Sequence, residues 1–560
     1  MTDALRALAE QWMAADPDAE TREEVDALLA GDAAELERRF SDRLTFGTAG
    51  LRGRLGAGPN AMNRVMARMA ASSLADVLLT RDEVAGGVAV GYDARHKSDL
   101  FAHDTARVLA RRGIPVHLLD HPLPTPLLAF TVRHRGCGAG VMVTASHNPP
   151  ADNGYKVYWG DGAQIVPPID RLIEERIAAT SPISDGDLGP AAPTPPQHLD
   201  GVEILDVDET VEAYLDATIG SRRSPRPGPK VAYTALHGVG GHIVSLAFRR
   251  AGLDPPVPVP AQQEPDGSFP TVVFPNPEEP GALDLVLDLA RSHQAGLVVA
   301  NDPDADRLAV AVADPGSEGG YRLLTGDELG VLLGDLRIRH TSGEDRLVAN
   351  SLVSSSLLGA LAGEAGVAHR ETLTGFKWIM RAAAEADGRR LIYGYEEALG
   401  YAVSEAVRDK DGISAAVAVV DLAAELAADG RTLLDRLDEL SARFGLHATA
   451  QVSPRFDDDP GRVEAVMSGL RTTPPDTLAG CAVTSAEDFL THDQPADLLR
   501  WRTADGDRII VRPSGTEPKV KCYLEVIVPV EGDGLQAARR LAGARLESLS
   551  GDVRALLAAD

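Results

Sequence analysis

The sequence predicts an α/β fold with three related α/β units, which have mixed sheets, and a smaller C-terminal α+β unit. Three observations predict it. A pattern of apolar strand, helix and apolar strand occurs three times along the chain. Each copy ends in a polar loop directly after an apolar run, and open α/β sheets bind ligands at the carboxyl ends of their strands. The last part of the chain instead shows a hairpin pattern, a further strand and a helix, which is typical of an α+β domain.

The 560 residues suit several domains. The predicted domains cover residues 1–204, 205–314, 315–437 and 438–560. A segment rich in Pro, Asp and Gly at 181–201 predicts a linker or a long excursion near the first boundary. The three polar loops, one in each α/β unit, are expected to converge on one cleft.

The first unit begins with about forty residues that read as helical. Thr21 with Glu24 predicts a capping box, and Gly31 predicts a helix end. Strands are predicted at 88–90, 115–119 and 140–143, and helices near 98–112 and from about 126. The third of these strands leads into the loop Thr144–Pro150.

The later units repeat the pattern. The second has predicted strands at 231–236 and 296–300, with helices near 242–251 and 282–293. The third has predicted strands at 347–350 and 390–393, with helices near 354–364 and 377–386. An apolar stretch at 413–427 contains two acidic residues, so it predicts a buried helix and not a membrane span. The last unit has predicted strands at 499–502, 508–512 and 519–528 and a helix at 535–549.

Composition excludes several classes of function. Lys and Arg number 55 and Asp and Glu number 83, so the formal charge is −28. This balance argues against nucleic acid and against anionic membranes as partners. The three cysteines lie far apart and have no metal-ligand spacing, which predicts a reduced, cytoplasmic setting. The N-terminal residues show no signal-peptide pattern.

The loop Thr144–Pro150 places the Ser146 hydroxyl beside His147, on a backbone stiffened by two prolines. We expect Ser146 to carry a phosphate, and a solvated turn is the alternative. Serine is a poor nucleophile at neutral pH and needs a nearby base or metal. The loop lacks both glycines of a hydrolase nucleophile elbow. Lys156 is expected to return to the site if the prolines fold the loop back.

A second polar loop has carboxylates at alternate positions, namely Asp302, Asp304 and Asp306. In extended backbone these side chains project to one side, and they repel one another unless a cation lies among them. Hard oxygen ligands of this kind suit Mg²⁺. A calcium hand is excluded, because Arg307 and Ala313 stand where Gly and Glu are needed. A phosphatase with Asp302 as nucleophile and a plain acidic turn both remain open.

Two further segments carry groups that suit anions. Residues 47–54 are glycine-rich and include Arg52, and residues 512–519 combine two cations with two hydroxyls and a glycine. Backbone amides and guanidinium groups bind oxyanions, although a flexible connection and a capped turn are the respective alternatives. Glu396 and Glu397 would accept hydrogen bonds from sugar hydroxyls, or form an ordinary surface pair.

Taken together, four segments resemble the signature motifs of the α-D-phosphohexomutase superfamily, in the same order and across nearly the whole chain. They are the serine loop, the Asp-x-Asp-x-Asp-Arg loop, the loop Gly394–Tyr401, and the Arg-Pro-Ser-Gly-Thr segment at 512–516. The form of Gly394–Tyr401, with residues 44–50 upstream, is most similar to the longer phosphoglucomutase/phosphopentomutase branch, whose bacterial relatives are often called phosphomannomutases. The resemblance implies four domains around a central cleft.

The resemblance implies a phosphosugar mutase, which is an isomerase. It would interconvert a sugar 1-phosphate with a 6-phosphate or 5-phosphate, through a phosphoserine and a sugar bisphosphate. Glucose and mannose phosphates are favoured, and ribose or deoxyribose 1-phosphate is the alternative. One Mg²⁺ per chain and an activator of the glucose 1,6-bisphosphate type are implied. Small sugar phosphates are the expected partners of a monomer or homodimer. A non-catalytic sugar-phosphate-binding protein is disfavoured by the intact Ser146 and the three aspartates.

The resemblance also implies roles for individual residues. Ser146 would be the phosphoserine, and its phosphate would complete the metal shell of the three aspartates. Lys156 matches the general acid/base candidate, with His147, Arg52 and Arg307 beside it. Ala398 departs from the serine that many hexomutases have at this place, which removes one polar sugar contact. The substrate-binding set is Thr374, Lys377, Glu396, Glu397, Lys410, Arg512, Ser514, Gly515, Thr516 and Lys519.

Overall fold

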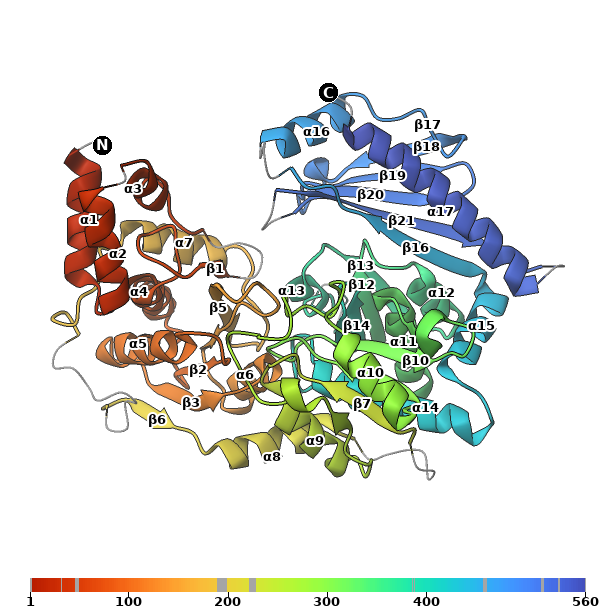
Figure 1. The fold of residues 1–560 in the computed structure, drawn as a ribbon, viewed down its shortest axis with the longest axis horizontal. Helices are drawn as coiled ribbons and strands as arrows, with labels where there is room; N and C mark the ends of the chain where they lie inside the picture. Colours follow the sequence, from red (N-terminus) through yellow and green to blue (C-terminus); the bar gives the residue numbers. More distant parts are fainter. Residues whose placement is uncertain are drawn as a thin grey trace. The chain divides into compact units, whose positions relative to one another are not determined.

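The computed structural model in Figure 1 describes residues 3–31, 33–45, 50–188, 199–220, 228–384, 386, 388–456, 461–514, 518–531 and 534–558. The chain divides into two compact units. The first unit comprises Met1–Leu324, Gly375–Arg381 and Ala398–Glu425, and the second comprises Thr325–Thr374, Ala382–Glu397 and Leu426–Asp560. The four domain ranges expected from the sequence are finer than this division and stay a prediction.

Three short helices open the first unit, as predicted: α1 (Asp3–Ala15), α2 (Ala19–Ala30) and α3 (Ala33–Phe40). The predicted capping box is wrong, because Asp18 is the N-cap of α2 and accepts a hydrogen bond from the Glu20 N–H. Thr21 lies inside the helix, where its hydroxyl donates to Asp16 (2.6 Å). Gly31 ends the helix, as predicted.

The first sheet is mixed and has the order β1-β5-β4-β2-β3-β6. Strand β2 is parallel to β3 and β4, whereas β5 is antiparallel to β4 and β1. The apolar runs that predicted β2 and β4 are buried at every position. The strands are β1 (Leu51–Arg54), β2 (Val88–Tyr92), β3 (Val116–Pro122), β4 (Ala139–Val143), β5 (Asp152–Trp159) and β6 (Val202–Ile204).

Four helices pack with this sheet or beside it: α4 (Arg64–Arg81), α5 (Ser98–Arg111), α6 (Thr125–His134) and α7 (Ile169–Ala179). Helix α4 was not predicted. It is buried on nearly all sides, contacts α5 and α7, and includes the fully buried Arg68. The sheet and helices α4, α5 and α7 share one apolar core, which also includes Trp12 and Phe40 from the N-terminal helices.

The second sheet of the first unit has the order β11-β10-β9-β7-β8. Strand β9 is parallel to β7 and antiparallel to β10, so this sheet is also mixed. Its strands are β7 (Val231–Thr234), β8 (Val257–Pro258), β9 (Leu297–Ala300), β10 (Ala309–Ala313) and β11 (Tyr321–Leu323). The neighbouring helices are α8 (Val207–Thr218), α9 (Gly240–Arg250) and α10 (Asp284–His293).

Two segments return to the first unit later in the chain. Helix α13 (Phe376–Ile379) is a single turn, so the helix predicted at 377–386 is too long. Strand β15 (Gly400–Ala402) lies beside Arg307 through an isolated bridge. Helix α14 (Gly412–Ala428) is the buried helix predicted at 413–427. Within the described ranges, no helix combines the length and the apolar character that crossing a membrane requires.

The second unit begins with parallel strands. Strand β12 (Arg346–Ser351) lies between β13 (Ala368–Thr372) and β14 (Arg390–Glu396) and is parallel to both. Helices α11 (Gly326–His340) and α12 (Leu357–Glu364) pack against each other, and both contact strands of this sheet. Helix α11 starts with a capping box between Thr325 and Glu328. Helix α15 (Leu433–Phe444) contacts both of them.

The C-terminal sheet is antiparallel and has the order β16-β21-β20-β19-β18-β17. The predicted hairpin is confirmed as the pair β19 and β20. Figure 1 shows the long helix α17 running along this sheet, where it contacts β16 and β21. The elements are β16 (Leu446–Val452), α16 (Gly461–Thr472), β17 (Thr477–Leu478), β18 (Cys481–Asp488), β19 (Leu499–Thr503), β20 (Arg508–Pro513), β21 (Val520–Val528) and α17 (Gly534–Ala558).

Candidate active site

Ser146 lies just beyond the end of β4, where its side chain is 2% exposed. Its φ is 53°, in the left-handed region that non-glycine residues rarely adopt. The Ser146 N–H donates to Thr144 Oγ1 (2.8 Å), and Ser146 Oγ donates to Asp302 Oδ2 (2.7 Å). The Nδ1 atom of His147 lies 3.2 Å from the same hydroxyl. The strained backbone therefore aims the serine at the distant aspartate loop, in agreement with the sequence prediction that they form one site.

Arg95, which the sequence analysis did not predict, stabilises this loop through hydrogen bonds to its backbone. It is buried, and its guanidinium donates to three backbone carbonyls of the loop and to that of Asp152, the first residue of β5. The acceptors are the carbonyl oxygens of Ser146 (2.6 Å), Asn148 (2.5 Å), Pro149 (2.8 Å) and Asp152 (3.0 Å). Charged donors make stronger hydrogen bonds than neutral ones, so the loop geometry depends on this one side chain.

Asp93 completes the support of the loop. Its carboxylate accepts hydrogen bonds from the Thr144 hydroxyl (2.6 Å) and from the Arg95 N–H (3.0 Å). Burial raises the pKa of Asp93, although Arg95 and Thr144 oppose the shift. A signal for both residues was present in the sequence, since Asp-x-Arg follows the apolar strand β2 directly.

Lys156 reaches the aspartates because β4 and β5 form an antiparallel pair in which it lies opposite Met142. Its ammonium group donates to Asp304 Oδ2 (2.7 Å) and to Asp306 Oδ2 (2.9 Å). Burial acts to lower the pKa of Lys156, but the two aspartates together raise it above its ordinary value. The structure thus places the Lys156 ammonium group at the aspartate loop, which Ser146 Oγ also contacts, and the role of this lysine stays a prediction.

The aspartate loop is a turn, so the expectation of extended backbone is wrong. Ala305 has a φ of 55°, and its N–H donates to the Asp302 carbonyl (2.9 Å). The turn still brings one carboxylate oxygen of each aspartate within 4.8 Å of the others. All three side chains are buried. Among the described residues, Asp304 Oδ1 and Asp306 Oδ1 have no hydrogen-bond partner.

The three carboxyl groups differ in their electrostatics. Burial, together with the charges of Asp304 and Asp306, raises the pKa of Asp302 well above its usual range. Burial also acts to raise the pKa of Asp304 and Asp306, but Lys156 holds both below the ordinary value. The Thr125 hydroxyl, which donates to Asp304 (2.6 Å), contributes to that shift. Two buried carboxylates with free lone pairs beside a third form a set that can bind a divalent cation.

Other predicted cations surround this cluster. Burial lowers the pKa of Arg52, and the three aspartates partly oppose that shift. Arg307 lies 3.2 Å from Glu278 and 3.9 Å from Asp302. The ammonium group of Lys410 is 3.1 Å from Asp306, so this lysine lies against the carboxylate cluster. Burial lowers the pKa of His147 well below its ordinary value, and Arg307 and Arg52 add to the effect.

Lys377 also belongs to the first unit, on the single turn α13. It is 6% exposed, and its ammonium group lies 5.9 Å from the centre of the Trp378 ring. Burial lowers its pKa. Among the described residues, the lysines that contact the three aspartates are Lys156 and Lys410, and not Lys377.

The second unit gathers the other predicted binding residues. Glu397 Oε2 accepts hydrogen bonds from the Ser351 hydroxyl (2.9 Å) and the Ser354 hydroxyl (3.0 Å). Glu396, Glu397 and Arg512 all lie close enough to Tyr523 to influence its pKa, which burial raises most. The two glutamates predicted to bind the sugar and the first residue of the segment predicted to bind an anion therefore all lie near Tyr523. Thr374 is half-buried at the end of its segment of this unit.

The structure describes only part of the segment 512–519, which is predicted to bind an anion. The Ser514 N–H donates to the Lys519 carbonyl (2.8 Å), and Lys519 forms a bridge with Arg455. Gly515 and Thr516 lie outside the described residues.

Asp327, on α11 of the same unit, is a buried carboxyl, and its Oδ1 accepts hydrogen bonds from the Ser355 N–H (2.6 Å) and the Tyr395 hydroxyl (3.1 Å). Burial raises its pKa to about 7 from an ordinary 3.8, a difference worth about 4 kcal/mol. The folded chain binds the Asp327 proton more tightly than the unfolded chain does, so protonation of Asp327 stabilises the fold. This stabilisation is fully present below pH 4 and is lost as the pH rises through 7. We expect Asp327→Asn to flatten the free energy of unfolding between pH 4 and 7, measured by urea denaturation.

The control for this prediction is the variant Asp345→Asn, whose aspartate is exposed on the same unit. It should keep the wild-type pH dependence. An Asp327→Asn protein with the wild-type slope would contradict the prediction.

Comparison with known sequence families gives one consistent result along the chain. Residues 43–183, 212–317 and 325–444 match the phosphoglucomutase/phosphomannomutase α/β/α domains I, II and III. Residues 464–544 match the C-terminal domain of the same family. The architecture of three α/β domains and one further domain, predicted from the sequence, is thereby confirmed.

Individual relatives agree in class and differ in the sugar named. A probable phosphomannomutase of Haemophilus influenzae is 43% identical over 468 residues, 83% of this chain and 93% of that protein. The phosphopentomutase of Mus musculus is 36% identical over 563 residues, 93% of this chain and 90% of that protein. In fold, the chain is similar to the open form of the phosphoglucomutase parafusin from Paramecium, with a TM-score of 0.69 at 20% identity, over 92% of this chain and 96% of that one.

Proposed function

We propose, on the premise that this chain belongs to the phosphoglucomutase/phosphomannomutase family of phosphosugar mutases, that it transfers phosphate between C1 and C6 of a hexose through a phosphoserine at Ser146. The observation that carries the proposal is the 2.7 Å contact from Ser146 Oγ to Asp302 Oδ2. It places a nucleophile in a buried cluster of three carboxylates and one lysine.

The carboxylate cluster fits a Mg²⁺ ion. Asp302, Asp304 and Asp306 would hold it, since each offers an oxygen to the same small region and two further oxygens lack a partner among the described residues. Mg²⁺ takes oxygen ligands of this kind. When bound, it would offset the charge of the phosphoryl group during transfer.

The transfer itself uses groups of this chain. The phosphoserine P–O bond breaks as a sugar hydroxyl forms a new P–O bond, and Ser146 Oγ takes up a proton as it leaves. Arg307 and Arg52 would stabilise the charge on the transferring phosphoryl group. The hydroxyl proton would pass to Lys156, at the aspartate loop, or to His147, beside the Ser146 hydroxyl. The reverse transfer from the sugar bisphosphate returns the other phosphate to Ser146.

In the second unit, Glu396 would bind sugar hydroxyls, and Arg512, Ser514 and Lys519 would bind the phosphate that is not transferred. A bisphosphate of the glucose 1,6-bisphosphate type would prime Ser146. The cytoplasmic location and the monomeric or dimeric state also stay predictions.

The pentose alternative has its own support, since the mouse phosphopentomutase aligns with 93% of this chain. We would measure kcat/KM for the 1-phosphates of glucose, mannose, ribose and deoxyribose side by side, with Mg²⁺ and the matching bisphosphate. The proposal requires the highest value for a hexose phosphate. A preference for ribose or deoxyribose would establish the pentose alternative, and no turnover of any of the four would overturn the proposed function.

Metal binding can be tested without turnover. A ligand present at 100 times its Kd stabilises a folded protein by about 2.7 kcal/mol. We therefore expect Mg²⁺ to raise the Tm of the wild-type protein by several degrees and Asp304→Asn to abolish the rise. Differential scanning calorimetry with and without EDTA measures it. The control is Asp314→Asn, outside the cluster, and an equal Mg²⁺ response in both variants would refute the assignment.

A further inference from the structure

Residues Ser351–Ser356 form a turn between β12 and α12 in the second unit, and we call it the 351–356 turn. It is bonded on one side to the sugar-binding segment Glu396–Glu397. On the other side it is bonded to strands β20 and β21 of the C-terminal sheet. The 351–356 turn therefore links two parts of the same unit that we assign to substrate binding.

The contacts with the sugar-binding segment converge on Glu397. Its Oε2 accepts from both the Ser351 and Ser354 hydroxyls, and its own N–H donates back to Ser354 Oγ (3.1 Å). Its backbone also lies against Gly326, where a Cβ atom would stand only 1.7 Å from the Glu397 carbonyl oxygen. Glu397 is thus fixed by carboxylate and backbone alike, next to Glu396 in the chain.

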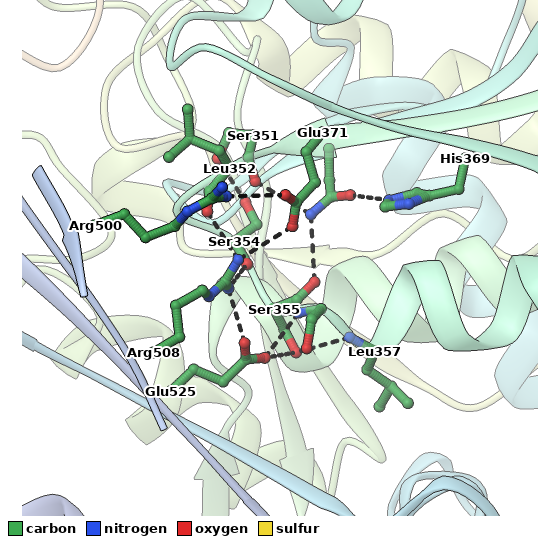
Figure 2. Close-up of polar contacts among 12 residues, drawn as sticks. Ser351, Leu352, Ser354, Ser355, Leu357, His369, Glu371, Arg500, Arg508 and Glu525 are labelled. Carbon is green, nitrogen blue, oxygen red and sulfur yellow. Dashed lines mark hydrogen bonds and ion pairs between the residues drawn. The ribbon is translucent and has the colours of Figure 1, made fainter. Parts of the chain in front are cut away.

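The opposite side of the 351–356 turn is held by a buried ion pair. Arg508 and Glu525 lie opposite each other on β20 and β21, 2.9 Å apart, and each is 3% exposed. Figure 2 shows both side chains pointing to the turn. Arg508 donates to the Leu352 carbonyl (2.9 Å) and to the Ser354 carbonyl.

The carboxylate of the pair, Glu525, also bonds to the 351–356 turn. Glu525 Oε1 accepts from the Ser355 hydroxyl (2.8 Å) and from the Ser356 N–H (2.7 Å). Burial acts to raise the pKa of Glu525, but the hydrogen bond with His447 and the charge of Arg508 hold this pKa at about 2. Breaking a buried, fully hydrogen-bonded pair leaves an uncompensated charge, so its geometry is strongly enforced.

We propose that Arg508 and Glu525 are positioning residues that orient Glu396 toward the sugar through the 351–356 turn and Glu397. This inference rests on the proposed function. Arg508 stands four residues before Arg512 on the same strand, β20. The ion pair therefore fixes the placement of the sugar-hydroxyl ligand relative to the strand that carries the phosphate ligand.

The test compares KM and kcat for the best sugar 1-phosphate in four variants: Arg508→Met, Glu397→Gln, their double variant, and the control Arg500→Met. Misplaced binding groups cost about tenfold or more, so we expect each of the first two to raise KM about tenfold with phosphoserine content at Ser146 unchanged. The double variant should be no worse than the more affected single one, because both act through one turn. Arg500, on β19, also pairs with Glu371 (3.5 Å), as Arg508 does (3.2 Å), and its loss should change KM less than twofold.

The inference is overturned if Arg508→Met keeps the wild-type KM, if it matches Arg500→Met, or if the two single effects multiply in the double variant. If Arg508→Met does not fold, Ser354→Ala in its place must raise KM and show the same non-additivity with Glu397→Gln. Wild-type protein that turns over no sugar phosphate would instead overturn the proposed function, so the two failures are distinguishable.

Discussion

Replacing Ser146 with alanine is expected to abolish phosphate incorporation into the chain and to lower kcat by at least about 1,000-fold. The Ser146 hydroxyl lies 2.7 Å from Asp302. Within the described residues, the one other hydroxyl that donates to the three aspartates is that of Thr125, which bonds to Asp304. The fold should survive, because the side chain loses one oxygen. The measurement is intact-protein mass after incubation with a sugar bisphosphate, together with steady-state kinetics.

Thr125→Val is the matched control for this substitution, since it removes the other hydroxyl at the cluster and should leave phosphate incorporation intact. Hydroxylamine distinguishes the phosphatase alternative, because it cleaves the acyl phosphate that Asp302 would form and spares a phosphoserine. A label that persists in Ser146→Ala and is released by hydroxylamine would contradict the assignment of Ser146.

The second large effect is expected at Arg95. In Arg95→Met, three backbone carbonyls of the serine loop and that of Asp152 lose their donor, and the buried Asp93 loses its charge partner (3.5 Å). Removing one member of a buried ion pair costs about 3–5 kcal/mol. A displacement of about 1 Å at the nucleophile costs about 100-fold in rate. We expect both losses, measured by urea unfolding and by kcat at a temperature where the variant is folded.

Arg107→Met separates the two effects. Arg107 is a buried arginine of the same unit, and its guanidinium lies near Asp104 and Asp185. Its loss should reduce stability and leave kcat unchanged. Arg95→Ala should regain part of its kcat when guanidinium chloride is added at low concentration. A folded Arg95→Met protein with wild-type kcat would show that the arginine contributes to stability alone.

The strands that deliver the site were predictable because they are buried on both faces. Val88–Tyr92, Ala139–Val143 and Leu297–Ala300 read as continuous apolar runs, the pattern of strands covered by helices. Strand β5 was not predicted, because it begins with polar residues and has no continuous apolar run. Its burial comes from its neighbours in the sheet, which a local pattern does not contain.

The helices that were missed or misjudged have related causes. Helix α4 is buried on nearly all sides, so it lacks the one-sided pattern that marks a surface helix. At α2, Asp18 and Thr21 are both suitable N-caps three residues apart, and the local sequence does not rank them. In the stretch 377–386 only Phe376–Ile379 continues as a helix.

For the site, the sequence pattern identified the reactive groups better than their supports. Ser146, Lys156 and the three aspartates are brought together as expected. The turn at Ala305 and the contact of Lys410 with Asp306 were not expected, because they depend on contacts between distant segments. Arg95 donates to backbone carbonyls, which every residue has, so the Asp-x-Arg pattern after β2 was the one signal for it and did not reveal its partners.

The connection that separates the nucleophile from its lysine leaves no room for insertions. Ser146 lies in the loop that connects the antiparallel strands β4 and β5, and Lys156 lies on β5. In this hairpin Val141 faces Val157 and Met142 faces Lys156. Successive side chains on a strand alternate between the two faces. One extra or one missing residue between these positions would shift the register of β5 by one. The ammonium group of Lys156 would then turn away from the carboxylates. Length changes during evolution or engineering of this protein should therefore be tolerated elsewhere on its surface before they are tolerated here.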